Sequence, residues 1–429
     1  MVWMAAVGLI FCAACQSPSS PSSLSSEDMV ASIVAATMQN WRVETETHTP
    51  ASSPRQTISP TPPAAHPTRP MVTATTKPAD GQSANQNKML PHTVYYLSGE
   101  TPARFQVWRM EKDGITQTQI TQEEAAITDF TVSPRDGSVV YLVHNLLYWI
   151  DAEGRNRHLL VDGGTVSDHS DTFYYYEKIN SPRFSPGGNT IAYGRGGLLL
   201  YDIAGNTSRM MVENRLVMLE EGGVMPAELF FPESWSPDGR KILVKIGWME
   251  GGSYAILDVG SGSLQYPSEK GILCCNATWT ADSRSVLISS RHSGMIESGL
   301  WRFDASGGKV TALLSNTTDS YNYVDWVLEL PNGNLQFFFH NSSKKLAGEV
   351  GLKIVQAAPD AVSNRRELRP EEYTLYSALW AADGSFALVI LPRQDEATYP
   401  QYGPLALLDL ASGELKTLLP LAYQIQWGP

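Results

Sequence analysis

The chain has 429 residues, of which 42% are hydrophobic and 18% are charged, as in a folded soluble protein with a weakly charged part. Its formal net charge of −12 argues against nucleic acids and anionic lipid surfaces as partners. Residues 1–15 carry no charge and residues 16–92 carry equal numbers of acidic and basic side chains, so the acidic excess belongs to residues 93–429.

The chain begins with an apolar run from Val2 to Ala14, which is too short to span a bilayer. Such a run is typical of a secretory signal. Small residues precede Cys15, and a polar stretch follows it. The pattern resembles a bacterial lipoprotein signal, which implies removal of residues 1–14, lipidation of Cys15 and an extracytoplasmic, membrane-anchored protein of the cell envelope. An ordinary cleaved signal and a core segment remain alternatives.

Residues 15–92 are predicted to be a tether. Ser26 is typical of a helix N-cap, and apolar residues recur on one helical face up to Trp41, which predicts a short helix over about 26–43. Residues 44–92 are rich in Thr and Pro without apolar periodicity, so we expect a disordered linker. A coil of that length has an end-to-end distance of roughly 40 Å.

Residues 93–429 repeat one pattern, best seen at Trp235-Ser236-Pro237-Asp238-Gly239, where Pro and Gly favour a tight turn between two strands. The residue before each such turn recurs 44 to 54 residues apart: Val132, Phe184, Trp235, Trp279, Trp326, Trp380 and Trp427. A second series of strand ends carries an acid at the same position, and repetition of this kind favours turn capping over catalysis: Asp151, Asp202, Asp258, Asp304 and Asp409.

An internal period of this length, with four short strands in each unit, is typical of a β-propeller. The repeats resemble those of TolB-type, WD-like propellers, with the best copies at 184–202 and 235–258. The resemblance implies an all-β fold, and it leaves the function open because this repeat serves many roles. We expect seven blades, with Gln424–Trp427 pairing beside Val94–Leu97 to close the ring.

No motif predicts an enzyme. The serine of Gly251–Ala255 opens a strand without a following helix, unlike a nucleophile elbow. The eight histidines share no metal-ligand spacing, so we predict no metal and no cofactor. We expect a monomeric, non-catalytic binding or scaffold protein for a protein, peptide, glycan or other envelope component. The alternatives are a propeller-type carbohydrate-active hydrolase or lyase, and an envelope assembly factor or sensor similar to TolB.

Cys274 and Cys275 lie in the propeller region. Adjacent side chains of a regular strand point to opposite faces and cannot form a disulfide. Buried free thiols are therefore expected, and a vicinal disulfide in a turn or an intermolecular disulfide is the alternative.

The segments that enter the first strand of each unit carry aromatic and acidic residues. Rings beside carboxylates on loops favour binding of a peptide, a sugar or a cation, although packing between blades would also use about half of such rings. The predicted ligand-binding residues are Asp171, Tyr174, Tyr175, Tyr176, Glu177, Phe230, Glu233, Tyr321, Tyr323, Asp325, Tyr373 and Tyr376.

Overall fold

The structure is a computed structural model, and it describes residues 89–166, 174–218, 224–248, 251–268, 275–292, 297–346, 350–393 and 401–429. The predicted signal, the lipidation site Cys15, the helix and the linker lie outside these residues. Among the described residues, no helix has the length and apolar character needed to cross a bilayer.

Antiparallel strands form six hydrogen-bonded sheets in the described part of the chain. Four sheets have four strands each: β4 (Ile127–Val132), β5 (Val139–Val143), β6 (Leu146–Ile150) and β7 (His158–Asp162); β8 (Asn180–Phe184), β9 (Thr190–Gly194), β10 (Gly197–Asp202) and β11 (Thr207–Glu213); β17 (Asn276–Trp279), β18 (Ser285–Ser290), β19 (Gly299–Asp304) and β20 (Val310–Leu314); β21 (Tyr321–Glu329), β22 (Leu335–Ser342), β23 (Lys353–Ala357) and β24 (Arg366–Glu367).

A fifth sheet has five strands: β12 (Arg215–Met218), β13 (Val224–Trp235), β14 (Lys241–Trp248), β15 (Gly251–Asp258) and β16 (Leu264–Gln265). The sixth has seven strands, in the order β25 (Ser377–Trp380), β26 (Phe386–Ile390), β27 (Gly403–Asp409), β28 (Leu415–Trp427), β1 (Val94–Ser98), β2 (Gln106–Met110) and β3 (Gln117–Gln119). Two short helical elements also occur: η1 (Pro102–Arg104) and α2 (Tyr174–Glu177).

The hairpin predicted around Trp235 is confirmed as the turn between β13 and β14. Ser236 N donates to Lys241 O at 2.9 Å, and Gly239 takes a φ of 71°, which residues with a side chain adopt at a cost. The Asp238 carboxylate accepts hydrogen bonds from Ser236 Oγ at 2.6 Å and from Arg240 N at 3.0 Å. Short side chains that bind their own backbone thus fix this turn.

The second series of acids caps turns, as predicted. Asp258 accepts a hydrogen bond from Ser261 N at 2.8 Å, and Asp409 accepts one from Ser412 N at 2.7 Å. Because these bonds stabilise the ionised carboxylate, they lower the pKa of both aspartates. The other members of the series also accept backbone hydrogen bonds within their turns: Asp151, Asp202 and Asp304.

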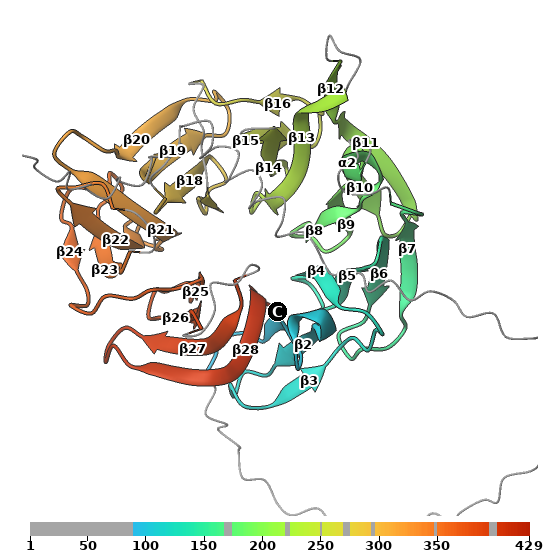
Figure 1. The fold of residues 1–429 in the computed structure, drawn as a ribbon, viewed down its shortest axis with the longest axis horizontal. Coiled ribbons are helices and arrows are strands. Elements are labelled where there is room, and N and C mark those ends of the chain that lie inside the picture. The colour runs from blue at the N-terminus through green and yellow to red at the C-terminus, as the bar shows by residue number, and fades with distance from the viewer. Residues whose placement is uncertain are drawn as a thin grey trace, which may run out of the picture. The chain divides into compact units, whose positions relative to one another are not determined.

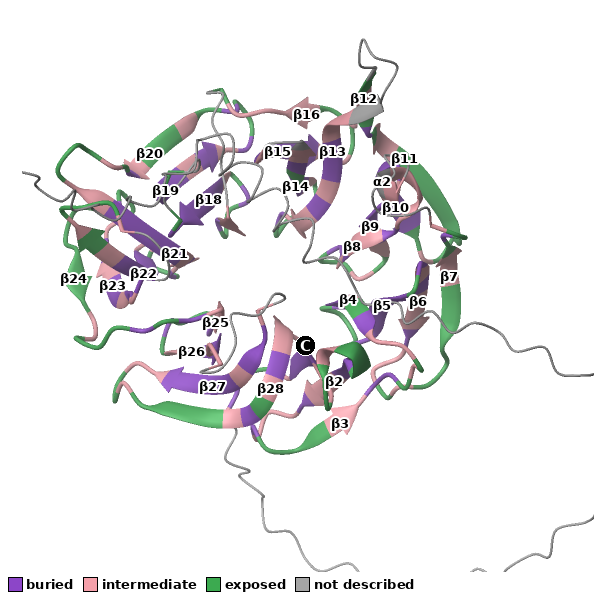
Figure 2. Ribbon diagram, in the orientation of Figure 1, coloured by how far each residue is buried: buried purple, intermediate pink, exposed green. Residues whose placement is uncertain are grey.

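Figure 1 shows the sheets side by side around a common centre. The strands β4, β8, β13, β21 and β25 lie nearest that centre, while β7, β11, β20 and β24 lie at the periphery. Buried residues are concentrated in the middle strands of the sheets, and exposed residues on the peripheral strands (Figure 2). Apolar side chains therefore fill the layers between neighbouring sheets, as in the cluster that joins Leu198 and Leu200 of β10 to Phe230 of β13 and Val244 of β14.

Three tryptophans that mark the repeat donate an indole hydrogen bond to the main chain one repeat earlier. The indole Nε1 of Trp235 donates to Arg183 O at 3.0 Å, and that of Trp380 donates to Trp326 O at 2.6 Å. Trp427 donates in the same way to Trp380 O at 3.0 Å. The bonds of Trp235 and Trp380 each join two sheets, whereas that of Trp427 lies within the seven-stranded sheet.

Strand β28 belongs to two parts of the seven-stranded sheet. Its first half pairs with β27, with Leu415 opposite Leu408, and its second half pairs with β1, with Trp427 opposite Val94. The predicted pairing of Gln424–Trp427 beside β1 is therefore present. Gly428 N continues it by donating to Thr93 O at 2.8 Å.

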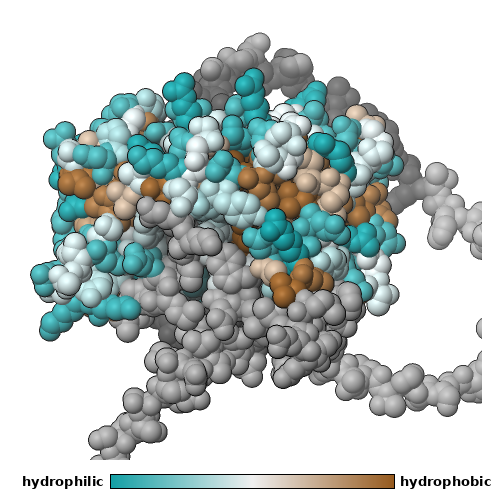
Figure 3. Space-filling model, turned by 90° about the horizontal axis from the view of Figure 1, so that it is seen from above, coloured by the Kyte–Doolittle hydropathy of each residue, from teal (hydrophilic) through white to brown (hydrophobic). Residues whose placement is uncertain are grey.

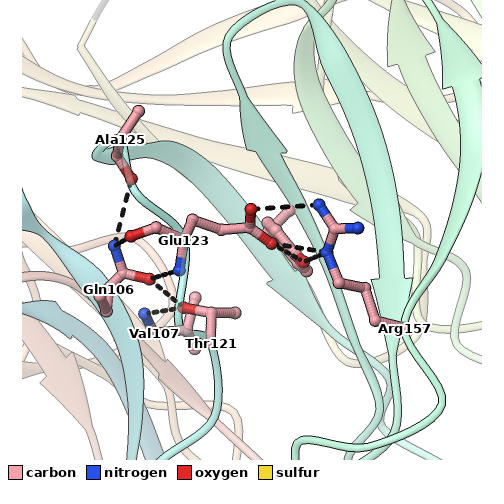
Figure 4. A network of polar contacts seen from close by, with 7 residues as sticks. Gln106, Val107, Thr121, Glu123, Ala125 and Arg157 are labelled. Carbon is pink, nitrogen blue, oxygen red and sulfur yellow. Dashed lines mark hydrogen bonds and ion pairs between the residues drawn. The ribbon is translucent and has the colours of Figure 1, made fainter. Parts of the chain in front are cut away.

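A polar network fixes the segment between β3 and β4 (Figure 4). Gln106 of β2 donates to the carbonyls of Glu123 and Ala125 at 3.2 and 3.1 Å. The Glu123 carboxylate accepts hydrogen bonds from Tyr141 Oη at 2.6 Å and from Arg157 Nε at 2.7 Å, and so joins β5 to the segment before β7.

In the view of Figure 3 the hydrophobic residues form a band with hydrophilic residues on both sides of it.

Candidate functional site

The inner strands carry partly buried charges near the common centre of the sheets. Asp129 of β4 and Arg183 of β8 form an ion pair at 3.5 Å, and Arg183 Nε also donates to Glu233 O of β13 at 2.9 Å. Desolvation raises the pKa of Asp129, and the nearby charge of Glu233 raises it further, while Arg183 opposes the shift. The Arg183 guanidinium therefore pairs with the Asp129 carboxylate and with the main chain of Glu233.

A buried ion pair joins the end of β18 to the inner strand β21. Arg291, which follows β18, is 7% exposed, and its Nε lies 3.3 Å from the Asp325 carboxylate of β21, which is 2% exposed. Asn276 of β17 also donates to Asp325, and Arg291 donates to Leu375 O at 2.8 Å. Burial raises the pKa of Asp325 to about 6, although Arg291 and Asn276 act to lower it.

Glu233 lines a cavity of about 310 Å³ that is shared by the inner strands of four sheets. The size suits a small ligand or one residue of a polymer. The walls combine two indoles with hydroxyl and amide groups: Asn276, Thr278, Ser289, Trp326, Ser377 and Trp380. The carboxylate of Glu233 makes no hydrogen bond or ion pair with any residue that the structure describes.

Irregular backbone occurs where these inner strands carry their polar residues. The register between β13 and β14 shifts at Pro232 and Ser234, which leaves Glu233 as the extra residue of a β-bulge. Bulges turn a side chain away from the regular alternation of a strand. Trp326 lies in a similar irregularity of β21 and has a φ of 45°, which is unusual for so large a residue.

A larger cavity, of about 470 Å³, lies at the turns between the sheets of β8–β11 and β12–β16. It is lined by Asp202, Arg209, Trp235 and Asp238, among others. Asp202 and Asp238 both bind the backbone of their own turns, so their carboxylates are already engaged. The central cavity has a carboxylate without such a partner and is the better candidate site.

Three of the predicted ligand-binding rings lie in the hydrophobic core. Phe230 is 1% exposed, Tyr323 0% and Tyr373 5%. Phe230 packs in the layer between β10 and β14, and the other two pack with Phe338 and Trp380. Because a ring without accessible surface cannot contact a ligand in this conformation, the structure corrects these three assignments toward packing.

Four other predicted residues are partly buried and have partners within the fold. Tyr174 contacts Lys178, whose Nζ lies 4.9 Å from the centre of the Tyr174 ring. Tyr176 Oη donates to Asn214 O at 3.0 Å. The others pack at the edges of core clusters: Tyr321 and Tyr376.

The remaining predicted residues do not gather around one point. The Glu177 carbonyl accepts a hydrogen bond from Asn145 Nδ2 at 3.0 Å, beside α2. Glu233 and Asp325 lie at the centre, in the cavity wall and directly behind it. Asp171 and the Tyr175 side chain lie outside the described residues.

Sequence reasoning missed Asp129, Arg183 and Arg291. A usable signal was present for Arg183, because it immediately precedes Phe184 of the repeat, as Asp325 immediately precedes Trp326. Comparing that position between repeats would have shown two charges among mostly uncharged residues.

Cys275 is disulfide-bonded, so the prediction of a free thiol is wrong for this residue. Its sulfur partner is not among the described residues, since Cys12, Cys15 and Cys274 all lie outside them. Residues 89–429, outside the gaps given above, contain no group of three or more His, Cys, Asp or Glu side chains placed to hold a metal ion.

No protein-family model matches this sequence, and no curated protein does either. Solved structures do resemble it. Puromycin hydrolase matches with a TM-score of 0.50 at 14% identity over 78% of this chain and 53% of its own. Oligogalacturonate lyase from Vibrio parahaemolyticus (TM-score 0.48, 12% identity, 76% of this chain and 86% of its own) and TolB from Acinetobacter baumannii (0.40, 14%, 78% and 82%) are also similar. At such identity the likeness to puromycin hydrolase shows a shared fold alone.

Proposed function

We propose that residues 93–429 form a seven-bladed β-propeller that binds a protein or another envelope component at its centre, outside the cytoplasm and tethered by lipidated Cys15. The blade count is supported by β28, whose halves pair with β27 and with β1. The seven-stranded sheet then divides into two blades of four strands that share β28, and the other five sheets supply one blade each.

The observation that carries the binding role is the central cavity of about 310 Å³. Inner strands of four sheets supply its walls, and buried ion pairs and indole hydrogen bonds fix those strands. A preformed concave site that combines apolar rings with a few polar groups is the usual form of a ligand site. The anchor and the extracytoplasmic location rest on the sequence around Cys15.

Photo-crosslinking in intact cells tests this proposal. We would replace Ser377, in the cavity wall, with p-benzoylphenylalanine, and would place the same group at Leu159, which is 44% exposed on the peripheral strand β7. Irradiation should give a discrete crosslinked product from position 377 and none from position 159.

Equal products from both positions, or none from either, would contradict binding at the centre. Turnover of a polysaccharide by the purified protein, abolished by Asp325→Asn in a variant that remains folded, would replace the binding role with catalysis.

A further inference from the structure

The charges near the central cavity do not balance. Asp325 is neutralised by Arg291 at 3.3 Å. Arg183 forms its ion pair with Asp129, at 3.5 Å, and gives Glu233 only a hydrogen bond to the main-chain carbonyl. These five charged groups therefore leave one negative charge in excess, on the carboxylate of Glu233.

Glu233 stands in the wall of this cavity. Glu233 is the extra residue of the bulge in β13, it is half-buried, and it lines the cavity wall. A carboxylate that is partly removed from water without a partner costs free energy, and a cation bound beside it would recover that cost. The carboxylate of Glu233 would repel a bound anion.

The rest of the wall suits a donor of several hydrogen bonds. Thr278, Ser289 and Ser377 line the cavity, and their hydroxyls make no hydrogen bond to other residues that the structure describes. A hydroxyl oxygen accepts hydrogen bonds, and an alkylammonium group offers three donors. Trp326, which is partly buried, also lines the cavity and offers apolar surface for the methylene groups of such a ligand.

We propose that the central cavity recognises a primary ammonium group on an aliphatic chain, as in a lysine side chain or an alkyl diamine, with Glu233 as its counter-ion. This inference rests on the proposed binding function and specifies the chemistry of that site.

Calorimetric titration of the full-length protein at pH 7 tests the inference. The probes are 1,5-diaminopentane, its uncharged counterpart 1,5-pentanediol and its anionic counterpart glutarate, which share one chain length and differ in their end groups. The diamine should bind with a stoichiometry of one, and the other two should not bind. Because a charge-assisted hydrogen bond is lost, Glu233→Gln should weaken diamine binding by about tenfold or more.

Glu228→Gln is the matched control, because Glu228 lies on the same strand but pairs with Arg215 at 2.9 Å. That variant should bind the diamine as the wild type does. Equal binding of the diol, unchanged affinity in Glu233→Gln, or no binding of the diamine would each overturn the inference. The two experiments decide different proposals. A failed titration overturns only the ammonium specificity if position 377 still crosslinks a partner in cells. A failed crosslinking experiment contradicts the proposed binding function itself.

Discussion

The buried pair of Arg291 and Asp325 shows how single residues shape this molecule. Asp325 is 2% exposed, and desolvation raises its pKa to about 6 in spite of the guanidinium beside it. A folded-state pKa above the unfolded value, about 3.9, means that the folded protein binds this proton more tightly. The contribution of Asp325 to the free energy of unfolding is therefore largest below about pH 4 and falls as the pH rises toward 6.

We predict a pH-dependent cost for Arg291→Met. At pH 8 the variant would hold an ionised carboxylate without a cation, which should lower the free energy of unfolding by about 3–5 kcal/mol. At pH 4 Asp325 is protonated, so a smaller loss should remain, from the hydrogen bond to Leu375 O. Denaturant unfolding at both pH values measures the difference.

The double variant Arg291→Met with Asp325→Asn is the control, since it removes both charges and should recover part of the stability at pH 8. Equal losses at pH 4 and pH 8 in the single variant would show that packing against Trp326, whose ring centre lies 5.0 Å from the guanidinium, matters more than charge.

At the residue scale the sequence predicted local interactions better than distant ones. The role of Asp258 followed from the turn residues beside it, because its partner is Ser261. Asp325 binds Arg291 and Asn276, which lie in another sheet and are separated from it by 34 or more positions. Which aromatic rings pack inside likewise depends on a neighbouring sheet, so Phe230 could not be distinguished from a surface ring.

At the scale of elements, β28 determines whether the first and last parts of the described chain stay together. Besides pairing with β1, it presents Gln426, whose Nε2 donates to Phe130 O at 2.9 Å and whose Oε1 accepts from Val132 N at 3.3 Å. The same end of the strand therefore contacts both β1 and β4.

Deletion of residues 421–429 should give an aggregating or unfolded protein, because β1 would then present an unpaired edge. Size-exclusion chromatography and thermal melting followed by circular dichroism would measure this. Trp427→Phe is the control, since it keeps the strand and loses one hydrogen bond, at a cost of about 1 kcal/mol. A deletion protein that is soluble and melts cooperatively would show that this pairing is dispensable.

The hairpins could be predicted because each depends on turn chemistry within a few residues. The continuity of β28 could not, since its 13 residues pass from one partner strand to another and include Pro420 within an apolar run. The four-residue helix α2 was also missed, because it is too short to show a helical period.

At the scale of the whole molecule, the acidic excess bears on the proposed lipid anchor. Residues 93–429 carry the net charge of −12, which disfavours direct adsorption to an anionic lipid surface. Retention at a membrane would then depend on the proposed lipid at Cys15. The anchor and the binding site can therefore be tested separately.

Replacing Cys15 with Ser should release the protein from the membrane fraction and abolish its labelling by an alkyne fatty acid, because each buried methylene of an acyl chain contributes about 0.8 kcal/mol to membrane binding. Cys12→Ser is the matched control: it changes a neighbouring cysteine within the same apolar run and should keep both the label and the membrane location. A Cys15→Ser protein that stays with membranes after a high-salt wash, still without the label, would indicate retention by the propeller or its partner. Labelled Cys15→Ser would place the modification elsewhere and refute the anchor.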